Sequence, residues 1–104
     1  KLISLMMAQI SENKALNSVF EDIFDPEGSE IYLKPAASYV QLSDPVNFYT
    51  VVESARRRGE TAIGYRVDAD ARHADRAYGI NLNPDKSAEV VFSARDKIVL
   101  LANE

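Results

Sequence analysis

The sequence predicts an α/β fold of the α+β kind, with N-terminal helices followed by a small mixed or antiparallel sheet and one packed helix. Apolar residues recur at helical spacing over residues 2–24. In residues 44–67 a helical pattern stops at a glycine and an alternating pattern begins. Residues 98–101 form an uninterrupted apolar run, which is typical of a strand buried on both faces.

Length and composition indicate a small folded module. The chain has 104 residues, enough for one domain with a modest core, and 46% of them are hydrophobic. A net charge of −4 argues against nucleic acid as a partner, because phosphate binding requires a basic face. The absence of cysteine excludes disulfides and thiolate metal sites, and no apolar run reaches the roughly 20 residues of a membrane span. Since the sequence begins at Lys1 without a methionine, we expect it to be part of a longer chain.

Residues 1–24 are predicted to form two helical segments. The first carries an apolar stripe of Leu2, Leu5, Met6 and Ile10, and Ser11 can cap the second segment. The second stripe is interpreted either as core or as a partner interface, because so short a chain has little core with which to cover both stripes. Its members are Leu16, Val19, Phe20, Ile23 and Phe24.

A short strand is predicted at residues 30–34, where Ile31 and Leu33 face one way and Tyr32 the other. Pro35 ends its pairing, because proline has no backbone N–H. Residues 36–42 are compatible with a short edge strand or with a buried loop.

Residues 44–67 are predicted to be a capped helix that leads into a strand. Asp44 or Ser43 can cap the helix, and Pro45 suits its first position. The expected buried stripe contains Val46, Phe48, Tyr49, Val51, Val52 and Ala55. Arginines 56–58 complement the helix carbonyls, and Gly59 ends the helix in the left-handed conformation. In the strand that follows, we expect Ile63, Tyr65 and Val67 on one face and Ala62, Gly64 and Arg66 on the other.

The C-terminal third is predicted to be mainly strands and turns. Residues 68–78 are polar and indicate a surface hairpin loop, after which residues 79–84 return antiparallel to residues 61–67. A weak strand is expected at residues 89–92, a turn at residues 93–96 and the buried strand at residues 97–102.

Few residues suggest a catalytic, metal-binding or cofactor-binding site. Asp68, Asp70 and Asp75 are weak metal-ligand candidates, since oxygen ligands at alternate positions can surround a cation, but the intervening arginines and the missing glycine oppose this interpretation. No glycine pattern for a dinucleotide or phosphate loop and no catalytic triad is recognisable. Arg66 must pair with an acid such as Glu30 or Asp96, or line a ligand groove, because an unpaired buried charge is costly.

Several stretches together resemble the cytosolic region of the CASTOR/POLLUX family of ion channels. They are Ser29-Glu30-Ile31-Tyr32-Leu33-Lys34-Pro35-Ala36, Asn47-Phe48-Tyr49, Ala55-Arg56-Arg57-Arg58, Ile63-Gly64-Tyr65-Arg66 and Ile80-Asn81-Leu82-Asn83-Pro84-Asp85-Lys86-Ser87. Residues 2–24 also fit, so the resemblance covers nearly the whole chain.

This resemblance implies a regulatory RCK-type domain at the cytoplasmic face of the cell membrane. Residues 1–24 would be crossover and dimerisation helices, and residues 29–104 the smaller C-lobe, whose last two strands flank a turn containing Asp96. The pore and the Rossmann-like lobe would lie upstream, so we expect no cofactor here and any nucleotide site in that upstream lobe. The second stripe of residues 16–24 becomes the candidate interface of a homodimer or ring, and potassium the expected ion.

Two other functions stay open at the level of the sequence. The chain could be a stand-alone module that binds a small ligand and is attached to a transporter or another membrane protein. It could also be a small enzyme that uses Arg66 and nearby acids, although the sequence favours a protein that is not an enzyme.

Overall fold

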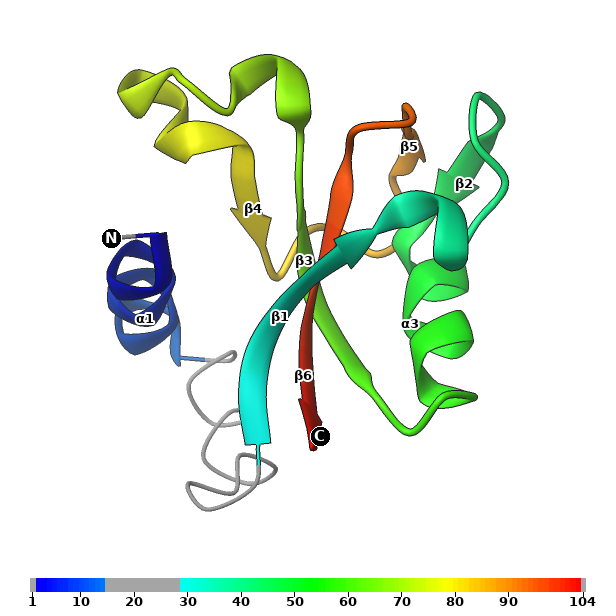
Figure 1. Ribbon diagram of the computed structural model, residues 1–104, viewed down its shortest axis with the longest axis horizontal. Coiled ribbons are helices and arrows are strands. Elements are labelled where there is room, and N and C mark those ends of the chain that lie inside the picture. The colour runs from blue at the N-terminus through cyan, green and yellow to red at the C-terminus, as the bar shows by residue number, and fades with distance from the viewer. Residues whose placement is uncertain (1, 15–28, 104) are drawn as a thin grey trace.

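The computed structural model describes residues 2–14 and 29–103 and confirms the predicted mixture of helices and antiparallel strands (Figure 1). Helix α1 (Leu2–Glu12) comes first, followed by β1 (Ser29–Pro35), the 3₁₀ turn η1 (Ala36–Ser38), β2 (Pro45–Asn47) and α3 (Phe48–Arg56). The chain continues with β3 (Thr61–Arg66), the 3₁₀ turns η2 (Asp68–Asp70) and η3 (Ala74–Gly79), β4 (Ile80–Leu82), β5 (Glu89–Val91) and β6 (Lys97–Asn103). The second predicted helical segment lies outside the described residues.

A four-stranded sheet in the order β1-β6-β3-β4 organises the described part of the chain, and all of its neighbouring strands are antiparallel. The last strand, β6, lies between β1 and β3. Its side chains alternate between two cores, with Ile98 and Leu100 in one and Val99 and Leu101 in the other. The apolar run therefore forms a strand buried on both faces, as predicted.

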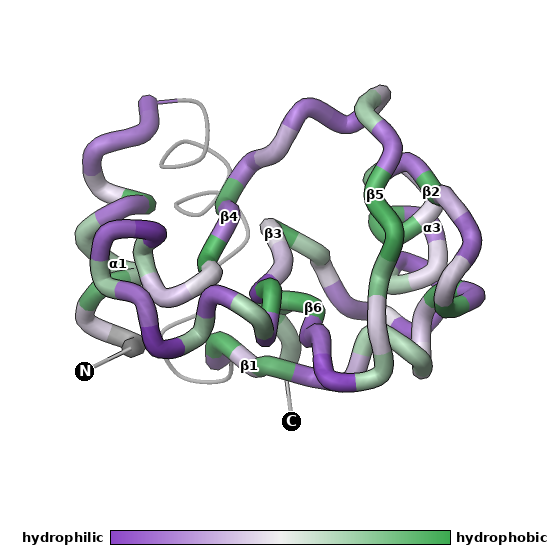
Figure 2. The backbone as a smooth tube through the Cα atoms, turned by 90° about the horizontal axis from the view of Figure 1, so that it is seen from above, coloured by the Kyte–Doolittle hydropathy of each residue, from purple (hydrophilic) through white to green (hydrophobic). Residues whose placement is uncertain are grey.

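The two α-helices of the described residues, α1 and α3, cover opposite faces of this sheet (Figure 1). On one face Phe48, Val51 and Ala55 of α3 pack with Phe92 and the β6 side chains. On the other face Met6 and Ile10 of α1 pack with apolar residues of β3, β4 and β6. Two members of the first predicted stripe, Met6 and Ile10, thus belong to the core of their own chain. Figure 2 shows hydrophobic stretches in β4, β5 and β6 and mostly hydrophilic connections between strands.

The predicted start of helix α3, near residue 44, was wrong. Residues 45–47 form β2, which pairs antiparallel with β5 in a separate two-stranded sheet. Asn47 is the cap instead of Asp44 or Ser43, and its side chain accepts a hydrogen bond from Thr50 N at 3.0 Å. Pro45 is tolerated in so short a strand, whereas Asn47 supplies the oxygen that the free amides of α3 require.

The buried face of α3 is narrower than predicted. Phe48, Val51 and Ala55 are buried, whereas Tyr49 is 59% exposed. The end of the helix agrees with the prediction, because Gly59 has φ = +73° and its N–H donates to Arg56 O at 3.0 Å.

A β-bulge in β3 overturns the predicted alternation of that strand. Ala62 pairs with Leu100 and Gly64 with Val99, so Ile63 is an extra residue between them. Ile63 consequently joins the α1 side of the sheet, whereas Tyr65 lies on the α3 side, with its ring centroid 5.3 Å from that of Phe92. A bulge breaks the two-residue period, and this is why the side chains predicted on one face lie on two.

Residues 36–42 form the 3₁₀ turn η1 and a loop, so of the two alternatives the loop is correct. Tyr39 of this loop is 6% exposed and belongs to the core on the α3 side. The other predicted strands are present: β1 and β5 lie where expected, and β4 returns antiparallel to β3 after the polar loop.

Candidate functional site

A largely buried polar cluster surrounds Glu60, just after the glycine that ends α3. The Glu60 side chain is only 10% exposed. One of its oxygens accepts a hydrogen bond from Lys34 Nζ at 2.7 Å, and the other accepts from the Tyr39 hydroxyl at 2.6 Å. Arg58 lies over the Tyr39 ring, with its Cζ 4.6 Å from the ring centroid. This cluster fastens β1 and the η1 loop to the connection between α3 and β3.

The electrostatics of the cluster favour a charged Glu60 and a neutral Tyr39. Burial by itself would raise the pKa of Glu60, but the hydrogen bonds from Lys34 and Tyr39 outweigh it and leave the pKa below its ordinary value. Burial and the bond to Glu60 raise the pKa of Tyr39 to about 12. The cluster therefore keeps one protonation state over the physiological pH range and acts as a fixed brace.

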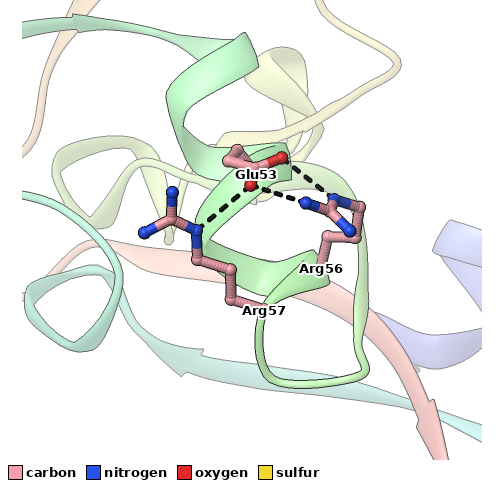
Figure 3. A network of polar contacts seen from close by, with 3 residues as sticks. All are labelled: Glu53, Arg56 and Arg57. Atoms are coloured by element: carbon pink, nitrogen blue, oxygen red, sulfur yellow. Dashed lines mark hydrogen bonds and ion pairs between the residues drawn. The ribbon is translucent and has the colours of Figure 1, made fainter.

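The exposed side of α3 carries a second polar group (Figure 3). Glu53 accepts two hydrogen bonds from Arg56, from Nε at 3.0 Å and from Nη2 at 2.7 Å, and a third from Arg57 Nε at 3.1 Å. These bonds lower the pKa of Glu53 to about 2. A shallow open groove of about 570 Å³ runs beside it and is lined by Tyr39, Asn47, Tyr49, Thr50, Glu53, Ser54 and Arg57. Two of the three arginines at the end of α3 are thus occupied by an acid of the same helix.

Arg66 holds the polar loop of residues 68–79. Its Nε donates to Tyr78 O at 2.9 Å and its Nη2 donates to Ala71 O at 3.2 Å. Ala77 and Tyr78 have φ values of +52° and +55°, which are uncommon for residues with a side chain. The arginine therefore stabilises an unusual backbone path. These two hydrogen bonds go to carbonyls rather than to Glu30 or Asp96, the acids suggested by the sequence.

Asp96 anchors the same loop from the β5–β6 turn and is 5% exposed. Its Oδ1 accepts from Asp68 N at 2.9 Å, and its Oδ2 accepts from Ser93 N at 2.8 Å. The aspartate that the family resemblance placed in this turn is thus a buried acceptor for two backbone amides.

The acidic candidates of this loop do not converge. Asp70 forms an ion pair with Arg76 at 2.8 Å, Asp68 begins η2 and Asp75 is exposed in η3. Within residues 2–14 and 29–103, no three histidine, cysteine or acidic side chains come close enough together to hold a metal ion.

Other predictions concern residues that the structure does not place. Leu16, Val19, Phe20, Ile23 and Phe24, the candidate dimer interface, lie outside the described residues. Among the helices that are described, none has the length and hydrophobicity required to span a membrane.

Sequence reasoning missed Glu60 and Tyr39. Glu60 directly follows a helix-ending glycine, a position that is normally solvated, and Tyr39 lies in a stretch without a clear pattern. Lys34 precedes Glu60 by 26 residues, so no local signal connects the two.

Comparison with known proteins confirms the resemblance over the whole chain. The chain is 33% identical over 104 residues to "Probable ion channel CASTOR" of Oryza sativa subsp. japonica, a match that covers 100% of the chain and 11% of that relative. It is 32% identical over 104 residues to "Probable ion channel POLLUX" of Arabidopsis thaliana, covering 99% of the chain and 12% of the relative. Identity to "Ion channel CASTOR" of Lotus japonicus is 32% over 104 residues, with 100% and 12% covered. No protein-family model matches. The chain therefore spans only about a ninth to an eighth of the length of these relatives.

Proposed function

This chain belongs to the CASTOR/POLLUX family of ion channels. We propose that it is a regulatory and assembly domain of such a channel and not an enzyme. The observation that carries the proposal is the extent of the match: all of the chain aligns, but with only 11% or 12% of each relative. A segment of that size is one part of a much larger protein. The relatives are named ion channels, which supports a role in ion conduction rather than in a chemical reaction.

The architecture supports a domain that transmits force. One seven-residue strand, β6, is shared by both cores, and helices lie on both faces of the sheet. The Glu60 cluster and the Arg66 contacts fix the connections at two ends of this sheet. Interiors packed in this way shift as units rather than deform gradually. We therefore propose that the module couples ligand or ion sensing to gating as an RCK-type C-lobe, by a change in its arrangement relative to its neighbours.

The proposal includes partners. Residues 16–24 carry the stripe with which we expect the module to form a homodimer or a larger ring, and the pore of the same longer chain is the element it would regulate. The conducted ion is proposed to be potassium, and the location the cytoplasmic face of the cell membrane. Any nucleotide would bind in an upstream lobe. Arg66 would brace the module described here rather than bind a ligand, because it donates hydrogen bonds to the loop carbonyls of Ala71 and Tyr78.

The test is a recording from the longest reading frame that carries this module. The full protein, reconstituted in planar bilayers in symmetrical KCl, is compared with a variant in which residues 29–103 are replaced by a flexible linker of equal length. We expect the same single-channel conductance and a changed open probability, because a regulatory lobe acts on gating and not on the pore. The surface variant Glu89→Lys, on the exposed strand β5, serves as the control and should gate normally.

Two results would reject the proposal. One is the absence of any potassium current from the full protein under all conditions in which the protein is shown to be inserted. The other is an open probability that the replacement leaves unchanged. For assembly, Phe20→Asp should lower the mass seen by light scattering, and an unchanged mass would remove residues 16–24 as the interface.

A further inference from the structure

The two edges of the main sheet differ in a way that suggests a partner for one of them. Strand β4, at one edge, is three residues long. Strand β1, at the other edge, has seven residues, and its pairing with β6 runs from Ser29 to Pro35 without a register shift. Within the described part of the chain, no segment pairs with the outer side of β1. Long, regular edges of this kind are templates for pairing with another strand.

The backbone groups that β1 offers at this edge follow from its register. Ala36 N donates to Asp96 O, so the residue after the strand points its N–H toward the β6 side. The direction of the backbone groups alternates along a strand. The N–H and C=O groups of Tyr32 and Lys34 therefore also point toward β6, whereas those of Ile31 and Leu33 point outward. Pro35 falls among the outward positions, where a missing N–H breaks no bond of the sheet.

We infer that the outer edge of β1 pairs antiparallel with β1 of a second copy of this chain, about a two-fold axis at Tyr32, and makes one continuous sheet of the two modules. In this register Ile31 exchanges backbone hydrogen bonds with the partner's Leu33, and Ser29 N–H donates to the carbonyl of the partner's Pro35. An antiparallel pair of identical strands satisfies the two-fold symmetry that most homodimers have.

The side chains favour this register and favour a second copy of the chain as the partner. Glu30 lies opposite the partner's Lys34, and the pair occurs twice because of the symmetry. Lys34 already contacts Glu60 at 2.7 Å and its side chain is 34% exposed, so Glu30 of the second copy would extend an existing ion pair. On the other face Ile31 meets the partner's Leu33, which continues the core on the α1 side. A shift of two residues in either direction places Glu30 or Lys34 opposite Tyr32 and loses both charge pairs.

This surface is distinct from residues 16–24, so the inference goes beyond the proposed function and does not depend on the channel role. The two can also be separated experimentally: a dimer that persists without contact between the two β1 strands would overturn the inference and leave the proposed assembly through residues 16–24 intact.

The chain offers a sharp test because it contains no cysteine. In the inferred register Tyr32 faces itself at a non-hydrogen-bonded position, where Cα atoms are about 4.5 Å apart, within the range of about 4.4–6.8 Å that a disulfide requires. The variant Tyr32→Cys of the 104-residue chain should therefore form a disulfide-linked dimer under mild oxidation. The control is Tyr49→Cys, at a 59% exposed position on α3. We expect Tyr32→Cys to cross-link roughly tenfold faster or more, because a preformed pair raises the effective thiol concentration.

A second variant tests the charge pairs without a new cysteine. Glu30→Lys places two lysines opposite each other and should raise the dissociation constant of the dimer in sedimentation equilibrium. Glu89→Lys makes the same charge change on the exposed strand β5 and should not. The inference is overturned if folded Tyr32→Cys cross-links no faster than Tyr49→Cys, as would be the case if another part of the same chain covers this edge. It is also overturned if the two lysine variants associate equally well.

Discussion

Replacing Tyr39 by phenylalanine removes a single oxygen from the Glu60 cluster and tests whether that cluster braces the fold. The Tyr39 hydroxyl lies 2.6 Å from Glu60 Oε1, and the tyrosine is 6% exposed. Phenylalanine keeps the ring, so the contact with Arg58 and the packing in the core should persist. The variant leaves a buried carboxylate with one donor fewer.

The magnitude follows from the hydrogen bond that is lost. A hydrogen bond to a charged group contributes about 1.5–3 kcal/mol to stability. We therefore expect Tyr39→Phe to lower the free energy of unfolding by about 1.5–3 kcal/mol at pH 7.

The pH dependence provides the more specific readout. Folding favours the neutral phenol, so the contribution of Tyr39 is fully present below its unfolded pKa of about 10 and is lost as the pH rises toward 12. Urea unfolding at intervals from pH 7 to pH 11.5 should show the difference between wild type and Tyr39→Phe shrinking above pH 10. Tyr65, whose pKa burial also raises, is common to both proteins and cancels in the difference.

Tyr49→Phe is the matched control, because Tyr49 is 59% exposed and lies on the outer side of α3. It should change the free energy of unfolding by less than about 0.5 kcal/mol. The reasoning is refuted if Tyr39→Phe is no more destabilising than this control at pH 7. A difference that stays constant up to pH 11.5 would equally show that the hydroxyl is not held by Glu60.

Substitutions at other positions test further contacts of the fold. Arg66→Ala should cost about 1–3 kcal/mol and speed amide hydrogen exchange in residues 68–79, since two loop carbonyls lose their donor; exchange at the wild-type rate would contradict the bracing role. Gly79→Ala should lower the unfolding temperature clearly more than Gly59→Ala. Both glycines have positive φ, but a Cβ at Gly79 would clash with the backbone oxygen of Val67, whereas a Cβ at Gly59 would have nothing within 4 Å. Equal losses of thermal stability in the two variants would show that the contact with the Val67 oxygen does not persist in Gly79→Ala. Asn47→Ala should lower the free energy of unfolding by about 0.5–2 kcal/mol in urea, and Asp44→Ala should leave it nearly unchanged. A larger loss from Asp44→Ala than from Asn47→Ala would indicate that Asp44 is the cap, as the sequence predicted.

Much of the fold could be predicted from local patterns. Helical spacing located α1, alternation located β1, and the apolar run of residues 98–101 located a strand buried on both faces. Gly59 indicated the end of α3 because few other residues adopt the left-handed conformation easily. These features depend on the preferences of neighbouring residues, which a sequence displays directly.

The candidate site was predicted less completely. Arg66 stood out in the sequence, but the group with which it pairs could not be predicted. In the structure it donates hydrogen bonds to the carbonyls of Ala71 and Tyr78. The sequence did not single out Glu60 or Tyr39, the members of the cluster that burial affects most. The resemblance to the channel family rested on several short motifs in order, and the whole-chain matches confirm it.

The sequence by itself determined the helix and strand patterns, the strand at the centre of the sheet and the family to which the chain is related. Only the tertiary structure decided that residues 45–47 pair with β5, that a bulge at Ile63 turns Tyr65 to the other face, and that Glu60 meets Lys34 and Tyr39. The physical reason is the range of the interactions. Periodicity and capping act between residues a few positions apart, whereas the pairing of a three-residue strand or the burial of a carboxylate depends on groups 20 or more positions away.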